Sequence, residues 1–140
     1  MRLKDKTAIV TGAASGFGAE IARQYVAEGA KVAVADINEA GAKAVADSLG
    51  ANAIAVACDV SKRADIDALV AKTVEAFGRI DIVVNNAGWT HRNQPMLEVD
   101  EATFDRVYDT NVKSIFHMTH AVVPLMRKQG GGVILNVGST

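Results

Sequence analysis

The chain has 140 residues, of which 49% are apolar and 22% charged, and 15 basic and 16 acidic side chains give a net charge of −1. This balance predicts that residues 1–140 form a single globular domain and excludes a disordered or fibrous chain. A nearly neutral charge gives no reason to expect nucleic acid or an anionic membrane as a partner. No apolar run approaches the roughly 20 residues of a membrane span and no signal peptide is recognisable, so we expect a cytoplasmic protein.

Short apolar runs alternate with helical periodicity along the whole chain, which predicts an α/β fold with a doubly wound parallel sheet. The runs are rich in Val, Ile and Ala, as expected of strands covered by helices on both faces. The five predicted strands comprise residues 7–11, 31–36, 53–58, 81–85 and 132–137. The one cysteine, Cys58, ends the third strand, and we expect a buried, unreactive thiol in a reducing compartment.

A glycine-rich turn, Thr11-Gly-Ala-Ala-Ser-Gly-Phe-Gly18, follows the first predicted strand and opens the first helix. Glycines allow a tight turn and a close approach of the backbone to a ligand, and the free N–H groups at a helix start attract an anion. The turn therefore predicts a cradle for a dinucleotide pyrophosphate, although its Gly-x-x-x-Gly-x-Gly spacing differs from the commoner Gly-x-Gly-x-x-Gly.

Polar or glycine residues follow the next three predicted strands as well. Asp36 ends the second strand, where a carboxylate can accept both hydroxyls of an adenosine ribose; a solvated turn aspartate is the alternative. Asp59-Val60 closes the third strand and Asn85-Asn-Ala-Gly88 closes the fourth. The carboxyl ends of parallel strands meet at one edge of a sheet, which is where open α/β sheets bind ligands.

Two later helices differ in their apolar patterns. The helix after the third strand has one apolar stripe, for which Ser61 is the expected N-cap. Residues 111–129 predict a helix that is apolar nearly all round, with Pro124 bending it locally. One stripe comprises Val112, Ile115, Phe116, Thr119, Val122, Val123 and Met126, and the opposite side carries Met118, Ala121 and Leu125. Such a helix must be covered twice, so we expect a subunit interface there.

The motifs, in their order and spacing, resemble those of the short-chain dehydrogenases/reductases, most closely the ketoacyl-carrier-protein-reductase and glucose-dehydrogenase types. The resemblance rests on Thr11-Gly-x-x-x-Gly-x-Gly18, Asp59-Val60, Asn85-Asn-Ala-Gly88, Asn111 and Val137-Gly-Ser139. It implies a Rossmann-type sheet of strand order 3-2-1-4-5. It also implies a homo-oligomeric oxidoreductase, a dimer or homotetramer, that transfers hydride between NAD(H) and an alcohol/carbonyl substrate.

The resemblance also implies individual roles. The cofactor contacts would be Gly12, Ser15, Gly16, Phe17 and Gly18 at the pyrophosphate, Asp36 and the adjacent Ile37 at the ribose, Asp59 and Val60 at the adenine, and Asn86, Ala87 and Gly88 along the cofactor. Ser139 would hydrogen-bond the substrate oxygen and Asn111 would anchor a water. A strand-end cap for Ser139 and a helix N-cap for Asn111 are the alternatives.

NAD is the expected form of the cofactor. The carboxylate of Asp36 would repel the 2′-phosphate of NADP, and Ser15 and Ile37 carry no positive charge to bind it. No metal is expected, because His117 and His120 have no cysteine or carboxylate beside them in a ligand pattern; we expect buried or interface histidines. Trp89, His91 and Arg92 follow the fourth strand, either on the substrate side or in a mobile loop.

The sequence departs from the family pattern at the catalytic Tyr-x-x-x-Lys pair. Neither Tyr25 nor Tyr108 is followed four residues later by lysine. General acid/base catalysis contributes about 10²–10⁴-fold to a rate, so we expect these 140 residues alone to be nearly inactive. We interpret them as the N-terminal portion of a longer enzyme, with the C-terminal strands of the sheet missing. A non-catalytic dinucleotide-binding module is the alternative, and a transferase with an adenosine-containing donor is less favoured.

Overall fold

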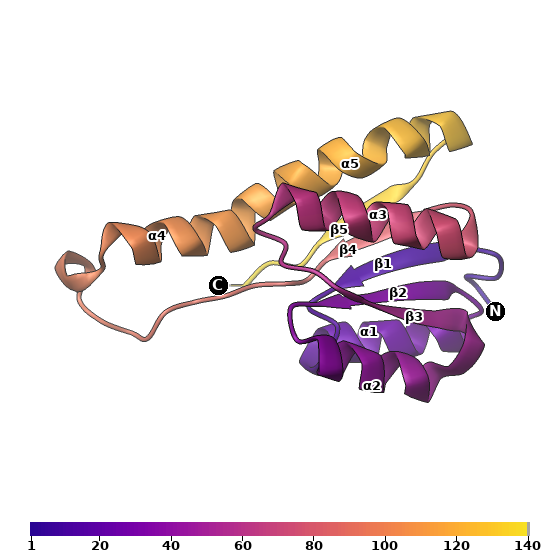
Figure 1. The fold of residues 1–140 in the computed structure, drawn as a ribbon, viewed down its shortest axis with the longest axis horizontal. Coiled ribbons are helices and arrows are strands. Elements are labelled where there is room, and N and C mark those ends of the chain that lie inside the picture. Colours follow the sequence, from indigo (N-terminus) through magenta and orange to yellow (C-terminus); the bar gives the residue numbers. More distant parts are fainter. Residues whose placement is uncertain (140) are drawn as a thin grey trace.

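The chain forms a five-stranded parallel sheet with helices on both faces, as the computed structural model describes it for residues 1–139 (Figure 1). The strands lie in the order β3-β2-β1-β4-β5, as expected. They are β1 (Thr7–Thr11), β2 (Lys31–Asp36), β3 (Ala53–Ala57), β4 (Ile82–Asn85) and β5 (Val133–Asn136). The helices are α1 (Gly16–Ala27), α2 (Glu39–Leu49), α3 (Arg63–Phe77), α4 (Glu101–Tyr108) and α5 (Ser114–Gln129). Short 3₁₀ turns occupy Gly50–Asn52 and Met96–Glu98, and a π-helical segment occupies Asp109–Lys113.

The last three strands are slightly shorter than predicted, because their end residues make only single bonds to a neighbouring strand. The N–H of Cys58 donates to the carbonyl of Asp36 at 3.0 Å, just after β3 ends. The N–H of Asp81 likewise donates to Thr7 at 2.8 Å before β4 begins. The prediction was therefore correct for the existence and order of these strands and wrong by one residue at some ends.

Two apolar layers hold the helices against the sheet. α1 and α2 cover one face, where Val10, Val32 and Val34 are buried, and α3 and α5 cover the other, where Ile9 and Val83 are buried (Figure 1). All five residues of β1 are buried because this central strand has a strand on each side and helices on both faces.

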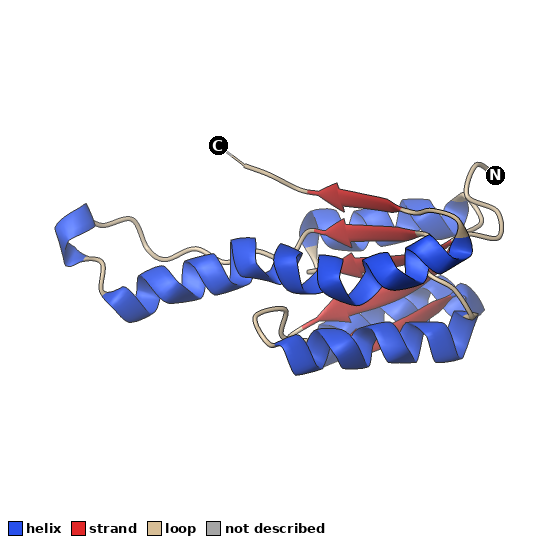
Figure 2. Cartoon of the chain, turned by 90° about the horizontal axis from the view of Figure 1, so that it is seen from above, coloured by secondary structure: helices blue, strands red, loops and turns tan. Residues whose placement is uncertain are grey.

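The edge strand β5 departs from the expected two-sided cover. Ile134 packs against the layer under α5, but Val133 and Leu135 are exposed on the other side. No helix within residues 1–139 covers that side of β5, which lies at the outer edge of the sheet (Figure 2).

The start of α3 differs from the prediction. Ser61 is not its N-cap: the helix begins after Lys62, and no side chain caps it. Ser61 instead donates its N–H and its hydroxyl to Oδ1 of Asp59, at 3.0 and 2.6 Å. The Ser61 hydroxyl, which was expected to cap the helix, is therefore bonded to the Asp59 carboxylate.

The predicted helix over residues 111–129 is part of a longer one. Helical structure runs from Glu101 to Gln129 through α4, the π-helical segment and α5. Asp100 caps its start by accepting from the N–H of Thr103 at 2.7 Å. Asn111 therefore lies inside the helix and is not its N-cap. Figures 1 and 2 show this helical arm extending beyond the carboxyl ends of the strands.

The apolar sides of α5 are also divided differently from the prediction. The buried row is Ser114, Met118, Val122 and Met126, spaced four residues apart. Met118 therefore shares a face with Val122, whereas Val112 and Phe116 are exposed. Every helix within residues 1–139 is too short or too polar to cross a membrane.

Candidate functional site

Two adjoining cavities lie at the carboxyl edge of the sheet, where the polar strand ends meet. The first, of about 310 Å³, contains Asp36 and Asp59, and the second, of about 500 Å³, contains Asn111 and Ser139. Their walls share Val60, Asn86, Ala87 and Gly88. Together the cavities form an elongated site with the shared wall in the middle. Four further predicted residues divide between the two: Gly12, Ser15 and Ile37 line the first, and Phe17 lines the second.

Gly16 and Gly18 line neither cavity, and they serve the turn in different ways. Gly16 takes the left-handed conformation, at φ 57°, which lets the chain enter α1. Gly18 packs beneath the turn: a Cβ there would lie 2.6 Å from Nδ2 of Asn86 and would overlap the carbonyl of Gly12. Gly18 thus lets α1 approach the turn.

The start of α1 has its first N–H groups free of side-chain acceptors. Ser15 occupies the N-cap position without a capping hydrogen bond, and the first turn contains no acidic residue. By contrast, Asn38 caps α2 by accepting from the N–H of Gly41 at 3.0 Å. Free N–H groups at the positive end of a helix dipole suit an anion.

Asp36 is fixed in place at the end of β2. Its two carboxylate oxygens accept from the N–H groups of Ala14 and Asn38, at 3.0 and 2.9 Å. Each oxygen retains a further lone pair, so the carboxylate can still accept hydroxyl groups from a ligand.

Asp59 is positioned by the turn that precedes α3. Its N–H donates to Oδ2 of Asp65 at 2.9 Å, and its own Oδ1 accepts from Ser61. Within residues 1–139, Oδ2 of Asp59 has no hydrogen-bond partner. It can therefore accept from an amino group of a ligand in the first cavity.

Thr11 and Asn86 join the glycine turn to the end of β4. The hydroxyl of Thr11 accepts from the N–H groups of Asn86 and Ala87, each at 3.0 Å. The side-chain amide of Asn86 donates to the carbonyls of Thr11 and Gly12, at 3.1 and 3.2 Å. The Asn86 amide group is therefore engaged in holding the turn, and Thr11 is a structural residue of the site that the sequence interpretation missed.

Asn111 forms a two-bond clamp on the segment after β4. Its Oδ1 accepts from the N–H of Trp89 and its Nδ2 donates to the carbonyl of Trp89, both at 2.8 Å. Each of these two atoms can make one further hydrogen bond, so the side chain can still hold a water. Asn111 and Ser139 line the same cavity, together with the apolar side chains of Ile115 and Met118.

Cys58 lines the first cavity but is buried. Burial, with the nearby carboxylates of Asp65 and Asp59, raises the pKa of Cys58 to about 12. A thiol with such a pKa stays protonated and unreactive at neutral pH. This agrees with the expected buried, inert cysteine.

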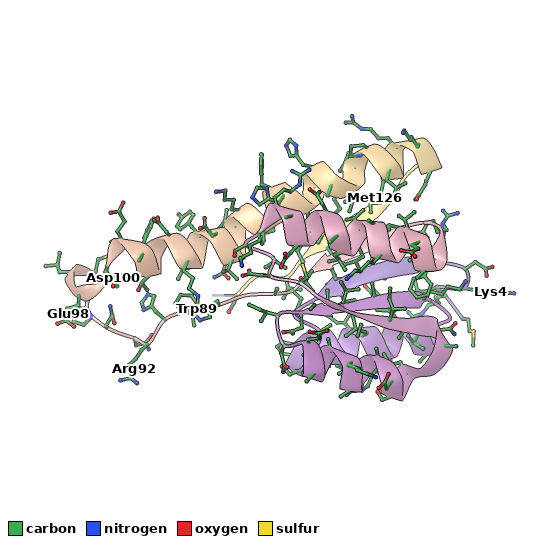
Figure 3. The ribbon with its side chains drawn as sticks, in the orientation of Figure 1. Lys4, Trp89, Arg92, Glu98, Asp100 and Met126 are labelled. Atoms are coloured by element: carbon green, nitrogen blue, oxygen red, sulfur yellow. The ribbon has the colours of Figure 1, made fainter. Side chains whose placement is uncertain are left out.

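The remaining candidates lie on the helical arm and its loop. Trp89 is half-buried beside the first cavity, whereas Arg92 lies farther out on an exposed part of the loop (Figure 3). His117 and His120 both lie against Phe116, with ring centres at 5.5 and 4.4 Å. His117 is half-buried and His120 is exposed, so of the two expected settings an interface is the one that His120 fits.

Arg106 and Thr110, both on the helical arm, also line the first cavity and were not predicted. No sequence signal marks them, because they reach the site only through the position of the helix.

Comparisons with known proteins agree with this geometry. A family model described as short chain dehydrogenase matches residues 6–140. The chain is 54% identical to 4-formylbenzenesulfonate dehydrogenase of Comamonas testosteroni, over 100% of this chain and 57% of that protein. It is 44% identical to sorbitol dehydrogenase of Cereibacter sphaeroides, over 99% of this chain and 54% of that protein. The chain thus spans about half the length of these curated relatives.

Solved structures give the same result. A 3-ketoacyl-(acyl-carrier-protein) reductase from Brucella melitensis complexed with NADH superposes with a TM-score of 0.95 at 43% identity, over 98% of this chain and 58% of the other. A 7α-hydroxysteroid dehydrogenase complexed with NADH and 7-oxo glycochenodeoxycholic acid superposes with a TM-score of 0.93 at 41% identity, over 99% of this chain and 55% of the other.

Proposed function

We propose that this chain, which belongs to the short-chain dehydrogenase family, is the cofactor-binding part of an oxidoreductase that transfers hydride between NAD(H) and an alcohol/carbonyl substrate. The observation that carries the proposal is the elongated site, whose two cavities join Asp36 at one end to Ser139 at the other. A dinucleotide has two nucleotide halves, and each cavity would take one of them. Two structural relatives at 41% and 43% identity were solved with NADH.

The residues fit the pyrophosphate of a dinucleotide. A Cβ on Gly12 would lie 2.9 Å from Cα of Ala87, so only glycine lets the turn pack this closely against the residues after β4. The uncapped start of α1 at Gly16, Phe17 and Gly18 supplies free N–H donors for the anion. We assign Ser15 to the same group, because it precedes these donors and lines the cavity.

The first cavity fits an adenosine. Asp36 would accept the ribose hydroxyls, and Ile37 would cover the ribose from the side. Oδ2 of Asp59 would accept from the adenine amino group, and Val60 would contact the ring. We propose NAD rather than NADP, because the Asp36 carboxylate opposes a 2′-phosphate. Asn86, Ala87 and Gly88 would then border the middle of the cofactor.

The second cavity would hold the nicotinamide and the substrate. Bound NAD(H) supplies or accepts the hydride. The hydroxyl of Ser139 would donate to the substrate oxygen, which gains negative charge as a carbonyl is reduced. Asn111 would hold the wall beside Trp89 in position through its clamp. These 140 residues contain no Tyr-x-x-x-Lys motif, so we propose catalysis for the whole protein only.

We also propose that residues 1–140 form one NAD(P)-binding domain and that the protein is cytoplasmic, which agrees with the single cysteine, Cys58, being buried and without a disulfide partner within residues 1–139. A homo-oligomer, a dimer or tetramer formed through residues 111–129, is proposed from the exposed apolar side chains of this helix.

Titration of the full-length protein with NADH and NADPH, followed by cofactor fluorescence, tests the binding proposal. We expect a lower dissociation constant for NADH, and Asp36→Ala should reduce the difference between the two cofactors. Tighter binding of NADPH by the unsubstituted protein would contradict the assignment.

A screen of alcohols, sugars and ketoacyl thioesters, followed by NADH absorbance, then tests hydride transfer. Cofactor binding without turnover of any of these compounds would favour the non-catalytic module.

A further inference from the structure

A stacked pair of side chains forms part of the wall of the first cavity. The guanidinium carbon of Arg106 lies 3.8 Å from the centre of the Trp89 ring. Both residues line the cavity that contains Asp36 and Asp59. Trp89 comes from the segment after β4 and Arg106 from α4, so two different elements meet at this wall.

The Trp89 side of the pair is held firmly. The main-chain N–H and carbonyl of Trp89 are both bonded to the Asn111 side chain at 2.8 Å. Trp89 is half-buried, although the loop that follows it is largely exposed. The main chain that carries the ring is therefore held in place.

Within residues 1–139, no carboxylate pairs with Arg106 to explain its position. The ion pairs found within residues 1–139 do not include it, and its side chain is exposed. A guanidinium is flat and stacks on aromatic rings through either face. Because the guanidinium of Arg106 lies over the Trp89 ring, a second flat ring in the cavity would stack on its opposite face.

We propose that Arg106, supported by Trp89, stacks on the adenine ring of the bound cofactor. The inference rests on the proposed NAD(H) function and adds a specific contact to it. Arg106 lines the cavity of Asp36 and Asp59 but not the cavity of Ser139, which assigns it to the adenosine end. The Asp36 carboxylate in the same cavity disfavours the other role for a cation there, binding a 2′-phosphate.

The test compares ligands that do and do not contain adenosine. Full-length Arg106→Ala is titrated with NADH and with reduced nicotinamide mononucleotide, using cofactor fluorescence. Loss of a cation–π contact weakens binding by about 2- to 30-fold. We expect this loss for NADH, no change for the mononucleotide, and an equal loss for NADPH. Arg106→Lys keeps the charge without the flat face and should recover only part of the affinity.

Arg127→Ala is the matched control, because Arg127 lies in the exposed last turn of α5 and lines neither cavity. Unchanged NADH binding by Arg106→Ala would overturn the inference, as would full recovery by lysine or a loss confined to NADPH. If the unsubstituted protein bound neither dinucleotide, the proposed function itself would fail, so the two failures are distinguishable.

Discussion

Gly18 lies so close to the glycine turn that no side chain fits there. In an ordinary helix, Gly→Ala stabilises by up to about 1 kcal/mol. At Gly18 the added methyl would collide with the Gly12 carbonyl and the Asn86 amide. We expect Gly18→Ala to destabilise the fold by about 1–3 kcal/mol and to weaken NADH binding about tenfold or more. Chemical unfolding and NADH fluorescence titration measure the two effects.

Gly50→Ala provides the control for this prediction. Gly50, unlike Gly18, has a positive φ, of 77°, but a Cβ there meets nothing within 4 Å, and the residue lies outside the site. The Gly50→Ala protein should lose some stability through backbone strain and keep its NADH affinity. Unchanged binding in Gly18→Ala would show that the turn is not the cofactor cradle.

Asp81 gives a prediction about pH. Burial alone would raise its pKa, but hydrogen bonds from the Arg79 guanidinium and the Thr7 N–H outweigh burial, so the pKa of Asp81 is lowered. A carboxyl whose pKa is lowered by folding stabilises the folded protein at pH values above its unfolded pKa of about 3.9. This contribution is lost as the pH falls through the pKa of the folded state. Asp81→Asn should therefore reduce the free energy of unfolding at neutral pH, by about 1–3 kcal/mol, and flatten its decline in acid.

Denaturant unfolding between neutral and acidic pH measures this effect. Asp47→Asn is the matched control: Asp47 is paired with Lys43 at 2.7 Å, but both side chains are about two-thirds exposed. The exposed pair is expected to make no measurable difference. Parallel pH profiles for Asp81→Asn and the unsubstituted protein would contradict the role assigned to Asp81.

At the scale of elements, the helical arm is attached at both ends of β4 by amide side chains. Asn111 clamps Trp89 after β4. Gln129 clamps Ile80 before β4, accepting from its N–H at 3.1 Å and donating to its carbonyl at 2.8 Å. Asn111 also lines the second cavity, so the helical arm forms part of the wall of the site. The two clamps hold this part of the wall at a set distance from the sheet.

Removing the Gln129 clamp should loosen the attachment of α5 to the sheet. Ile80 is fully buried, so Gln129→Ala leaves its main-chain groups without partners and is expected to cost about 1–3 kcal/mol of stability. Hydrogen exchange at the Ile80 amide should become faster. Gln24→Ala, which removes only an exposed bond to Glu20, is the control. Unchanged protection of Ile80 would mean that the packing of Met126 and Val122 alone holds α5.

The elements also explain which parts of the site the sequence could predict. The meeting of Asp36, Asp59 and Asn86 follows from the rule that parallel strands place their carboxyl ends at one edge. The strand order was implied by the family resemblance. α4 was not predicted, because none of its residues is buried and it therefore has no core-facing stripe. The Arg106–Trp89 stack depends on where this helix lies, which local patterns do not specify.

At the scale of the whole molecule, the helical arm has an uncovered apolar ridge. It consists of Phe104, Tyr108, Val112 and Phe116, which are four residues apart and 50% to 56% exposed. The rings of Phe104 and Tyr108 stack with their centres 4.9 Å apart. Residues at this spacing lie along one side of a helix. An isolated helix as short as α4 gains little stability from its own hydrogen bonds, so a covering surface is expected.

A second copy of the chain can cover this ridge with its own, because a two-fold axis brings identical surfaces together. Phe116→Asp would place a charge in the middle of that contact and should convert the oligomer of the full-length protein to smaller species, measured by light scattering at micromolar concentration. Ala71→Asp, on the exposed side of α3, is the matched control and should leave the molar mass unchanged. A stable monomer of the unsubstituted protein would refute the interface. If Phe116→Asp left the molar mass of the oligomer unchanged, the subunits would associate through another surface. Other residues of the same chain would then have to cover the ridge.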